Sequence, residues 1–161
     1  MAHIADLPIV LRTALRLYPW RQIADPVPLT VLRKPITAST VALVTTAGLV
    51  RPGDAPFDDA VAGGDYSFRV LPATTDVAAL EEHHRSASFD HSGIARDPNL
   101  AFPLDRLREM AAEGAIGAVA PRHLSFMGSI TAPGRLVRRT APAAAALLAA
   151  DGVDIALLVP V

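Results

Sequence analysis

The chain has 161 residues, of which 51% are hydrophobic, 19% charged and 5% aromatic, a composition that excludes a disordered chain and a coiled coil. Its 15 Lys and Arg residues nearly balance 16 Asp and Glu residues, so charge provides no reason to expect nucleic acid or an anionic membrane as a partner. Cysteine is absent, which excludes disulfides, thiolate metal sites and thiol catalysis within these residues.

Signals for membrane insertion and export are also missing from the sequence. No apolar run approaches the roughly 20 residues that a membrane span needs. The N-terminal stretch MAHIADLPIV has neither the basic region nor the long apolar region of a signal peptide. We therefore expect a cytoplasmic protein. Its length predicts one domain, and the abundance of Ala, Val and Leu predicts a core of small and medium aliphatic side chains.

The first elements of the chain alternate between helix and strand. Residues 7–18 (LPIVLRTALRLY) place apolar side chains on one face with helical period, which predicts an amphipathic helix. Residues 29–33 predict a short edge strand held between Pro28 and Pro35. Residues 39–48 predict a stronger strand, because an unbroken apolar run precedes a glycine.

The next segments predict a loop, a strand and a helix. Residues 49–65 are acidic and rich in Gly and Pro, which predicts a surface loop. Residues 66–72 alternate in polarity and end at a proline, as expected for a strand. Residues 75–85 predict a helix, with Thr75 or Asp76 available as its N-cap.

The second half has a clearer pattern. Residues 102–114 predict a helix that ends at Gly114, and residues 115–121 predict the strand that follows it. Residues 140–152 predict an Ala-rich helix, and residues 153–159 predict a final strand. Because this last strand is apolar without interruption, we expect it in the interior of the sheet.

Helices and strands that alternate with short connections predict the fold class. We expect an α/β protein with a mainly parallel sheet and helices on both faces, in a flavodoxin-like or Rossmann-like arrangement of three layers. We expect residues 1–161 to form a single domain. In such a sheet, functional groups usually lie just beyond the carboxyl ends of the strands.

Four segments reach this carboxyl edge in the predicted fold: residues 45–48, 72–76 and 121–135, and whatever follows Val161. The third is longer than most connections between a strand and a helix. Its polar side chains could bind or position a ligand, or it could be an ordered loop packed through Leu124, Phe126 and Met127. The candidates from these segments are Thr45, Thr46, Arg122, His123, Ser125, Gly128, Ser129 and Thr131.

Residues 81–92 (EEHHRSASFDHS) concentrate histidines and acids, which are ligands of non-thiolate metals and acid–base groups. His83 and His84 are adjacent and cannot share a helix face, so a solvated helix end is favoured and no metal is expected. His91, which follows Asp90, is the strongest candidate of the three histidines. Another possible function for this segment is that of a hydrolase whose metal ion is held by His83, His91 and Asp90. Residues 135–139 (RLVRR) could pair with an anion or form a solvated face.

Longer stretches carry a family resemblance. DHSGIARDPNLAFPLDRLREMAAEGAIGAVAPRHLSFMGSI (90–130) and TAPAAAALLAADGVDIALLVPV (140–161) resemble the selenoprotein B family of glycine/sarcosine/betaine reductase and D-proline reductase. VALVTTAGLVRPGDAPFD (41–58) and DYSFRVLP (65–72) are similar to the N-terminal region of that family. The resemblance runs from about residue 40 to the end of the chain.

The resemblance implies a reductase component that cleaves a C–N or related bond of a small amino-acid-type substrate. Its nucleophile would be a selenocysteine or cysteine in a U/C-x-x-C motif after the strand that reads DIALLVPV, and therefore after Val161. We expect no further cofactor. His123, Ser125, Ser129 and His91 would support catalysis, and Thr45, Thr46, Arg122, Gly128 and Thr131 would bind or position the substrate.

The absence of the nucleophile leaves several explanations open. A UGA codon for selenocysteine read as a stop, a deliberately shortened chain and a natural short homologue would all end in this way. We expect residues 1–161 to be the N-terminal part of a longer family-type domain and to be inactive alone. The partners expected are other subunits of a reductase complex and a second copy of the chain, because a last strand without a covering helix favours a homodimer. The alternative is a non-catalytic α/β module that binds a small anion or a subunit.

Overall fold

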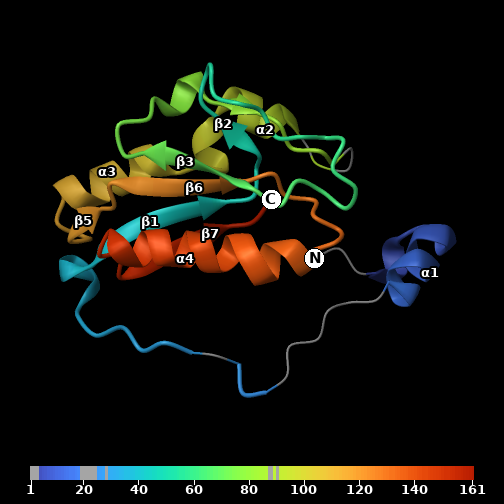
Figure 1. The fold of residues 1–161 in the computed structure, drawn as a ribbon, viewed down its shortest axis with the longest axis horizontal. Coiled ribbons are helices and arrows are strands. Elements are labelled where there is room, and N and C mark those ends of the chain that lie inside the picture. The colour runs from blue at the N-terminus through green and yellow to red at the C-terminus, as the bar shows by residue number, and fades with distance from the viewer. Residues whose placement is uncertain (1–3, 19–24, 28, 87–88, 90) are drawn as a thin grey trace. The chain divides into compact units, whose positions relative to one another are not determined.

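In the computed structural model, residues 4–18, 25–27, 29–86, 89 and 91–161 are described. The chain divides into two compact units, residues 1–31 and residues 32–161. The first unit contains a 3-10 turn, Ile4–Asp6, and helix α1, Ile9–Leu17 (Figure 1). The helix predicted over 7–18 is therefore confirmed. No residue of α1 is buried.

The strand predicted over 29–33 is wrong. All five residues are described, and none is in a strand. Leu29 is 88% exposed and Val31 is 77% exposed, so their apolar side chains gain no burial that would hold a strand. A 3-10 turn, Ile36–Ala38, follows Pro35 directly.

The second unit is built on a mixed, mainly parallel sheet whose central strand is β1, Thr40–Thr45. Strands β5 (Ala118–Val119), β6 (Arg122–Phe126) and β7 (Ile155–Val159) all pair with β1 in parallel. Strand β3, Phe68–Pro72, pairs antiparallel with β6. The strands predicted within 39–48, 66–72, 115–121 and 153–159 are confirmed, and the parallel direction follows for the pairs around β1 (Figure 1).

Helices pack against both faces of this sheet because successive side chains of β1 point to opposite sides. Val41 and Leu43 join a core with Phe102 and with Leu104 and Leu107 of helix α3, Leu104–Ala112. Ala42 joins a second core with helix α4, Ala141–Ala150. Both helices were predicted. The glycine after each one, Gly114 and Gly152, has a positive φ, as expected beyond a helix end.

The predicted helix over 75–85 is wrong. The structure has a 3-10 turn, Val77–Ala79, and then strand β4, Glu81–Glu82. Asp76 caps only this short turn, accepting a hydrogen bond of 3.0 Å from the amide of Ala78. Val77 is buried in the core, and pairing of β4 with β2, Leu49–Val50, draws the following residues out of helical conformation.

The segment 49–65 is only partly the predicted surface loop. Leu49 and Val50 are fully buried, and Phe57 and Asp65 are also buried. The carboxylate of Asp65 accepts hydrogen bonds from the amides of Asp58 and Ser67, which folds the segment back on itself. The polar composition of the segment predicted a fully exposed loop, although these four side chains are buried.

Two further predictions about the sheet are corrected. The segment 121–135 is not one long loop, because strand β6 occupies its first part. Strand β7 is not interior: within the described residues it pairs only with β1. Leu157 and Leu158 of β7 are 42% and 66% exposed. Elements not foreseen are helix α2 (His91–Arg96), a 3-10 turn (Pro98–Leu100) and a π-helical turn (Leu136–Thr140).

Candidate functional site

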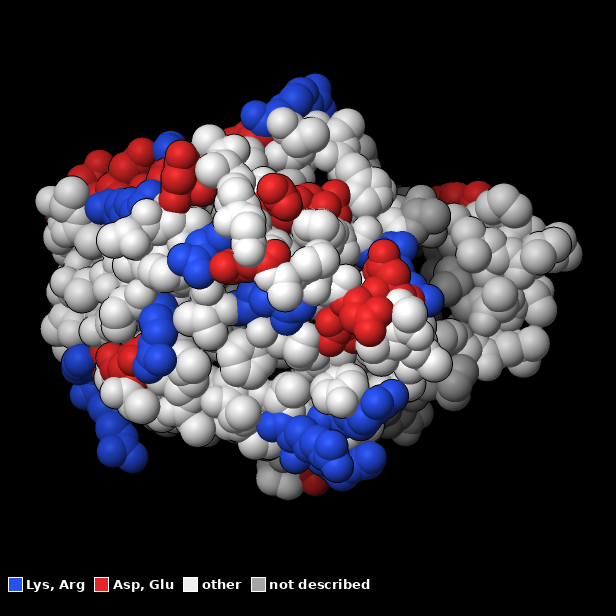
Figure 2. All heavy atoms as spheres, turned by 45° about the horizontal axis from the view of Figure 1, so that its top comes forward, with Lys and Arg blue, Asp and Glu red and all other residues white. Residues whose placement is uncertain are grey.

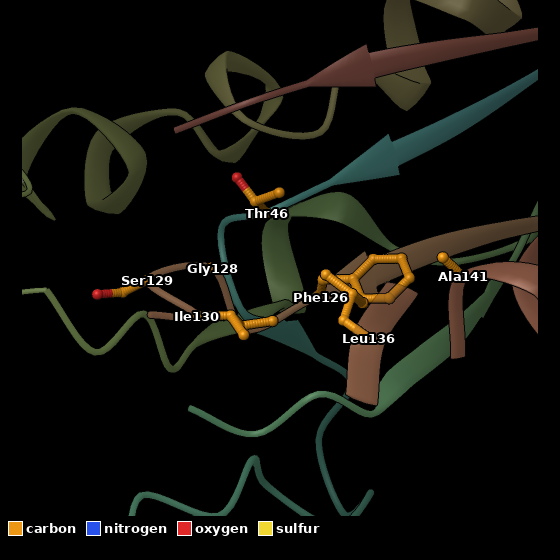
Figure 3. A pocket seen from close by; sticks show the side chains of 7 residues that line it. All are labelled: Thr46, Phe126, Gly128, Ser129, Ile130, Leu136 and Ala141. Carbon is orange, nitrogen blue, oxygen red and sulfur yellow. The ribbon is translucent and has the colours of Figure 1, made fainter. Parts of the chain in front are cut away.

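An open cavity of about 360 Å³ lies at the carboxyl ends of β1 and β6. Its walls come from the residue after β1, the end of β6, the loop after β6, and the helical segment that leads into α4 (Figure 3). Three of the residues predicted for the site, Thr46, Gly128 and Ser129, line it. The complete lining is Thr46, Phe126, Gly128, Ser129, Ile130, Leu136 and Ala141.

The loop after β6 turns sharply at Gly128 and Ser129, which have φ values of 71° and 46°. A Cβ atom at Gly128 would lie 2.3 Å from the carbonyl oxygen of Thr46 and 2.6 Å from Nε2 of His84. Both contacts are far inside van der Waals distance. Only glycine therefore fits here, for its φ and for the close approach of its neighbours.

Gly63 and Gly64 pack closely against the loop that follows β6. A Cβ atom at Gly64 would lie 2.9 Å from Cα of Ile130, and one at Gly63 would lie 2.3 Å from Cβ of Ala132. The amide of Ala132 also donates a hydrogen bond of 3.1 Å to the carbonyl of Gly63. Close backbone packing therefore holds one wall of the cavity.

Thr46 connects the cavity to the end of β7. Its Oγ1 accepts a hydrogen bond of 3.0 Å from the amide of Val161 and donates one of 3.4 Å to the Val161 carbonyl. The Thr46 amide donates to the carbonyl of Val159. The neighbouring Thr45 is fully buried, and its Oγ1 accepts from the amide of Ala47. Thr46 is thus at the cavity, whereas Thr45 stabilises the turn beneath it.

The helical wall is widened by the π-turn. The amide of Ala141 donates to the carbonyl of Leu136, five residues earlier, and both residues line the cavity. In a regular α-helix the ring of Pro142 would clash with the carbonyl of Arg138. The wider turn just before Pro142 relieves that clash and shapes the wall.

His123 and Ser125 lie inside β6 and are fully buried, away from the cavity lining. Nδ1 of His123 accepts a hydrogen bond of 2.9 Å from the amide of Leu43, and the ring meets that of Phe102 edge to face. Burial, assisted by the charge of Arg108, lowers the pKa of His123 to about 4. Nε2 of His123 and Oγ of Ser125 have no hydrogen-bond partner among the described residues.

Arg122 and Thr131 are also outside the cavity lining. Arg122 begins β6, at the opposite end of that strand from the cavity, and its guanidinium binds both carboxylate oxygens of Asp151 at 2.8 and 2.5 Å. This hydrogen-bonded pair raises the pKa of Arg122 and lowers the pKa of Asp151. Arg122 therefore joins β6 to the end of α4.

The histidine-rich segment reaches the loop after β6 through His84. His84 is buried, and burial lowers its pKa against the opposing influence of Glu82. Glu82 accepts a hydrogen bond from the amide of His84 and contacts Nδ1 of His91 at 2.5 Å. The sequence predicted this cluster of histidines and acids, but it did not predict that Glu82 would bind both His84 and His91. His83 interacts instead with Glu81, and Asp90 lies outside the described residues.

Charged side chains of both signs lie on the face seen in Figure 2, and basic side chains gather in one group near its lower edge. Among the described residues, no group of three or more His, Asp or Glu side chains could hold a metal ion. In the same part of the chain, no helix is long and apolar enough to cross a bilayer.

The fold and cavity define an α/β protein with an open, largely apolar cavity at the carboxyl edge of a mainly parallel sheet. The family described as glycine/sarcosine/betaine reductase selenoprotein B matches residues 18–160. The chain belongs to this family. No solved structure matches it.

Three curated relatives are named as subunits of reductases. The chain is 37% identical to the D-proline reductase subunit gamma of Acetoanaerobium sticklandii, over 80% of this chain and 51% of the relative. It is 28% identical to the glycine reductase complex component B subunit gamma of Carboxydothermus hydrogenoformans, over 83% and 31% of the two chains. It is 27% identical to the sarcosine reductase complex component B subunit beta of Peptoclostridium acidaminophilum, over 68% and 25%. The chain spans about half or less of the length of these relatives.

Proposed function

We propose that this chain provides the substrate-binding edge of an amino-acid reductase component that cleaves a C–N bond reductively. One observation carries the proposal: Thr46 lines the cavity and also binds the amide of Val161. A group adjoining Val161 would therefore lie beside a cavity of about 360 Å³, which is large enough for a small amino-acid-type substrate.

The nucleophile in this proposal is a selenocysteine or cysteine outside these residues, since they contain no cysteine. Cleavage of a C–N bond to C–H and N–H requires two electrons and two protons, which a dithiol supplies as it becomes a disulfide. The chain alone is inactive under this proposal, because it lacks the group that attacks the substrate.

Each candidate residue has a part in this proposal. Thr46, Gly128 and Ser129 contact the substrate, whereas Thr45, His123 and Ser125 fix β1 and β6 beneath it. These three support the site through the strands rather than by contact. His91, Arg122 and Thr131 do not contact the substrate. His91 acts through Glu82, and Arg122 stabilises the fold through its contact with Asp151 at the end of α4.

We further propose that the protein works in the cytoplasm as part of a multi-subunit reductase. The names of the relatives support partner subunits, since two are described as members of component B of a complex. The exposed Leu157 and Leu158 of β7 support a covering partner, which we propose is a second copy of the chain. We also propose that the longer domain to which this chain belongs has the flavodoxin-like or Rossmann-like arrangement of three layers.

Turnover by the full-length protein with its partner subunits tests this function. D-proline, glycine, sarcosine and betaine are supplied separately with a dithiol, and the cleaved product and the oxidised thiol are measured. We expect turnover of at least one substrate, and loss of it in Thr46→Val, which keeps the shape but removes the hydroxyl that binds Val161. Tight binding of a small anion with no turnover of any substrate would favour the non-catalytic module.

A further inference from the structure

We infer that His84 is a further binding residue of the candidate site, whose Nε2–H group donates a hydrogen bond to an oxygen atom of the bound substrate. The inference rests on the proposed function, because it takes the cavity as the substrate site. Three observations support it: the fixed position of His84, its unpaired donor atom, and the contact of that atom with Gly128 in the cavity wall.

The backbone of His84 is held in place by β4 and by the turn between β1 and β2. The carboxylate of Glu82 accepts a hydrogen bond from the His84 amide. The amide of His83 donates one of 3.0 Å to the carbonyl of Gly48. A Cβ atom at Gly48 would lie 2.8 Å from the amide nitrogen of His84, so the two backbones pack without room for a side chain. The point from which the His84 side chain projects is therefore fixed.

The ring of His84 is fixed as well, and its contacts determine where its proton lies. The amide of Ser86 donates a hydrogen bond of 3.2 Å to Nδ1, and the ring centroid of Phe89 lies 4.5 Å from that of the imidazole. Burial lowers the pKa of His84, so the ring is neutral at pH 7. A neutral imidazole has one acceptor and one donor nitrogen. Because Nδ1 is the acceptor, Nε2 carries the proton.

This donor is left without an acceptor in the fold. His84 is only 9% exposed, and its Nε2 is buried with no hydrogen-bond partner among the described residues. Buried polar groups of native proteins are usually paired, and those that are not often have a functional reason. An unpaired donor in this position points to an acceptor that arrives with a ligand.

Nε2 of His84 lies directly behind the cavity wall. A Cβ atom at Gly128 would lie 2.6 Å from Nε2 and 2.7 Å from Cδ2, so this edge of the ring packs against Gly128, which lines the cavity (Figure 3). Because glycine has no side chain and adopts both signs of φ, a small displacement of its turn would open a path to Nε2. This contact distinguishes His84 from His123, whose unpaired Nε2 belongs to a ring that lies against Phe102 in the core.

The cavity lining itself offers little to an anionic oxygen. None of the seven lining residues is charged. The hydroxyl of Thr46 is already hydrogen-bonded to Val161, and Figure 3 shows that of Ser129 directed away from Phe126. A carboxylate that enters such an apolar cavity needs a donor to replace its hydration. His84 would supply one, and a hydrogen bond to a charged acceptor is strong in surroundings of low polarity.

Nitrogen-15 NMR of the full-length protein, labelled at histidine, tests the hydrogen bond directly. In the free protein we expect the tautomer of His84 with its proton on Nε2. Saturation with D-proline, glycine, sarcosine or betaine, whichever is turned over, should move the Nε2–H proton resonance downfield as the bond forms. Methylammonium chloride has no acceptor atom and should leave the resonance unchanged. A resonance that does not respond to the bound substrate would overturn the inference, and so would an equal shift with methylammonium.

Steady-state kinetics of three variants separate the donor from the packing of the ring. His84→Phe keeps an aromatic ring against Gly128 but removes the donor. We expect its KM to rise at least about tenfold, with kcat within about threefold of wild type. His84→Gln carries an amide N–H at a similar reach and should recover most of that loss. His83→Phe is the matched control and should behave as wild type, because His83 is adjacent but its ring interacts with Glu81.

Each outcome of these kinetics decides the matter. A wild-type KM in His84→Phe would overturn the inference. Equal losses in His84→Phe and His84→Gln would also overturn it, because the shape of the imidazole would then matter and not its donor. Each variant is measured below its unfolding midpoint. If the wild type turns over a substrate, either result overturns only the role of His84. If it turns over none of the four substrates, the proposed function is overturned and the inference with it.

Discussion

The backbone amide of Leu43 donates its hydrogen bond to a side chain, Nδ1 of His123, at 2.9 Å. Strand β5 pairs with β1 at Thr40 and Val41, and β6 pairs with β1 only from Val44 onward. The imidazole fills the gap between these two ladders, where a buried amide would otherwise have no acceptor. His123 therefore completes the sheet beneath the cavity.

This contact makes stability depend on pH. His123 is neutral in the fold because its pKa is lowered to about 4, whereas in the unfolded chain it titrates near 6.5. Between these values the unfolded state binds more protons, so stability falls as pH decreases from 6.5 to 4. We expect this residue to account for a loss of about 3 kcal/mol in the free energy of unfolding, measured by urea denaturation at each pH.

Two variants separate the titration from the hydrogen bond. His123→Asn can keep an acceptor near the Leu43 amide but does not titrate, so its stability should change much less between these pH values. His123→Leu leaves the amide unpaired and should be less stable than His123→Asn at pH 7, by about 1–3 kcal/mol. A pH dependence that is identical in the wild type and His123→Asn would contradict this role.

The close packing of Gly64 against Ile130 should be required for ligand binding. Gly64→Ala would bring its new methyl group to within 2.9 Å of Cα of Ile130. Because this contact would displace the cavity wall, we expect the affinity for the small amino-acid-type substrate to fall at least about tenfold. Gly53→Ala is the matched control, because Gly53 also has a positive φ but nothing within 4 Å. Equal affinities of the two variants would exclude a role for this contact.

Arg122 should affect stability without affecting binding. Arg122→Ala removes both hydrogen bonds to Asp151, so we expect a lower unfolding midpoint in differential scanning fluorimetry. Because Arg122 lies at the far end of β6 from the cavity, ligand affinity should stay within about twofold of the wild type. If Arg122→Ala lost most of its ligand affinity but kept the wild-type unfolding midpoint, Arg122 would be a binding residue instead.

The exposed face of β7 should mediate association. We expect this chain to form dimers at micromolar concentration in multi-angle light scattering, because dimerisation would cover Leu158, which is 66% exposed. Leu158→Lys should give monomers, whereas Leu100→Lys, at another exposed leucine in a 3-10 turn, should not. A wild-type chain that stays monomeric would count against the homodimer.

The sequence predicted the order of the main strands and helices because their hydrophobic period is local. It failed where a partner distant in sequence decided the structure. Strand β4 contains only Glu81 and Glu82 and exists because it pairs with β2. Strand β7 has an apolar sequence typical of an interior strand, but its number of neighbours depends on the rest of the fold.

The cavity overlaps the predicted site residues only in part, and the reason is the same. Thr46, Gly128 and Ser129 were predicted because they follow strands at the carboxyl edge, and all three line the cavity. His123 and Ser125 were expected in the same loop, but their segment is a strand and their side chains are buried. The roles of Leu136 and Ala141 depend on a π-turn, for which the position of Pro142 was the one signal in the sequence.

Reductase turnover of Gly128→Ala, compared with Gly152→Ala, tests most directly whether the cavity is the substrate site. Both glycines have a positive φ, near 70°, so the backbone strain is matched, but only Gly128 has neighbours within 4 Å. The comparison uses the full-length protein with its partner subunits, below the unfolding midpoint of each variant. We predict that kcat/KM falls at least about 100-fold in Gly128→Ala and stays within about threefold of wild type in Gly152→Ala. Wild-type kcat/KM in Gly128→Ala would contradict the account.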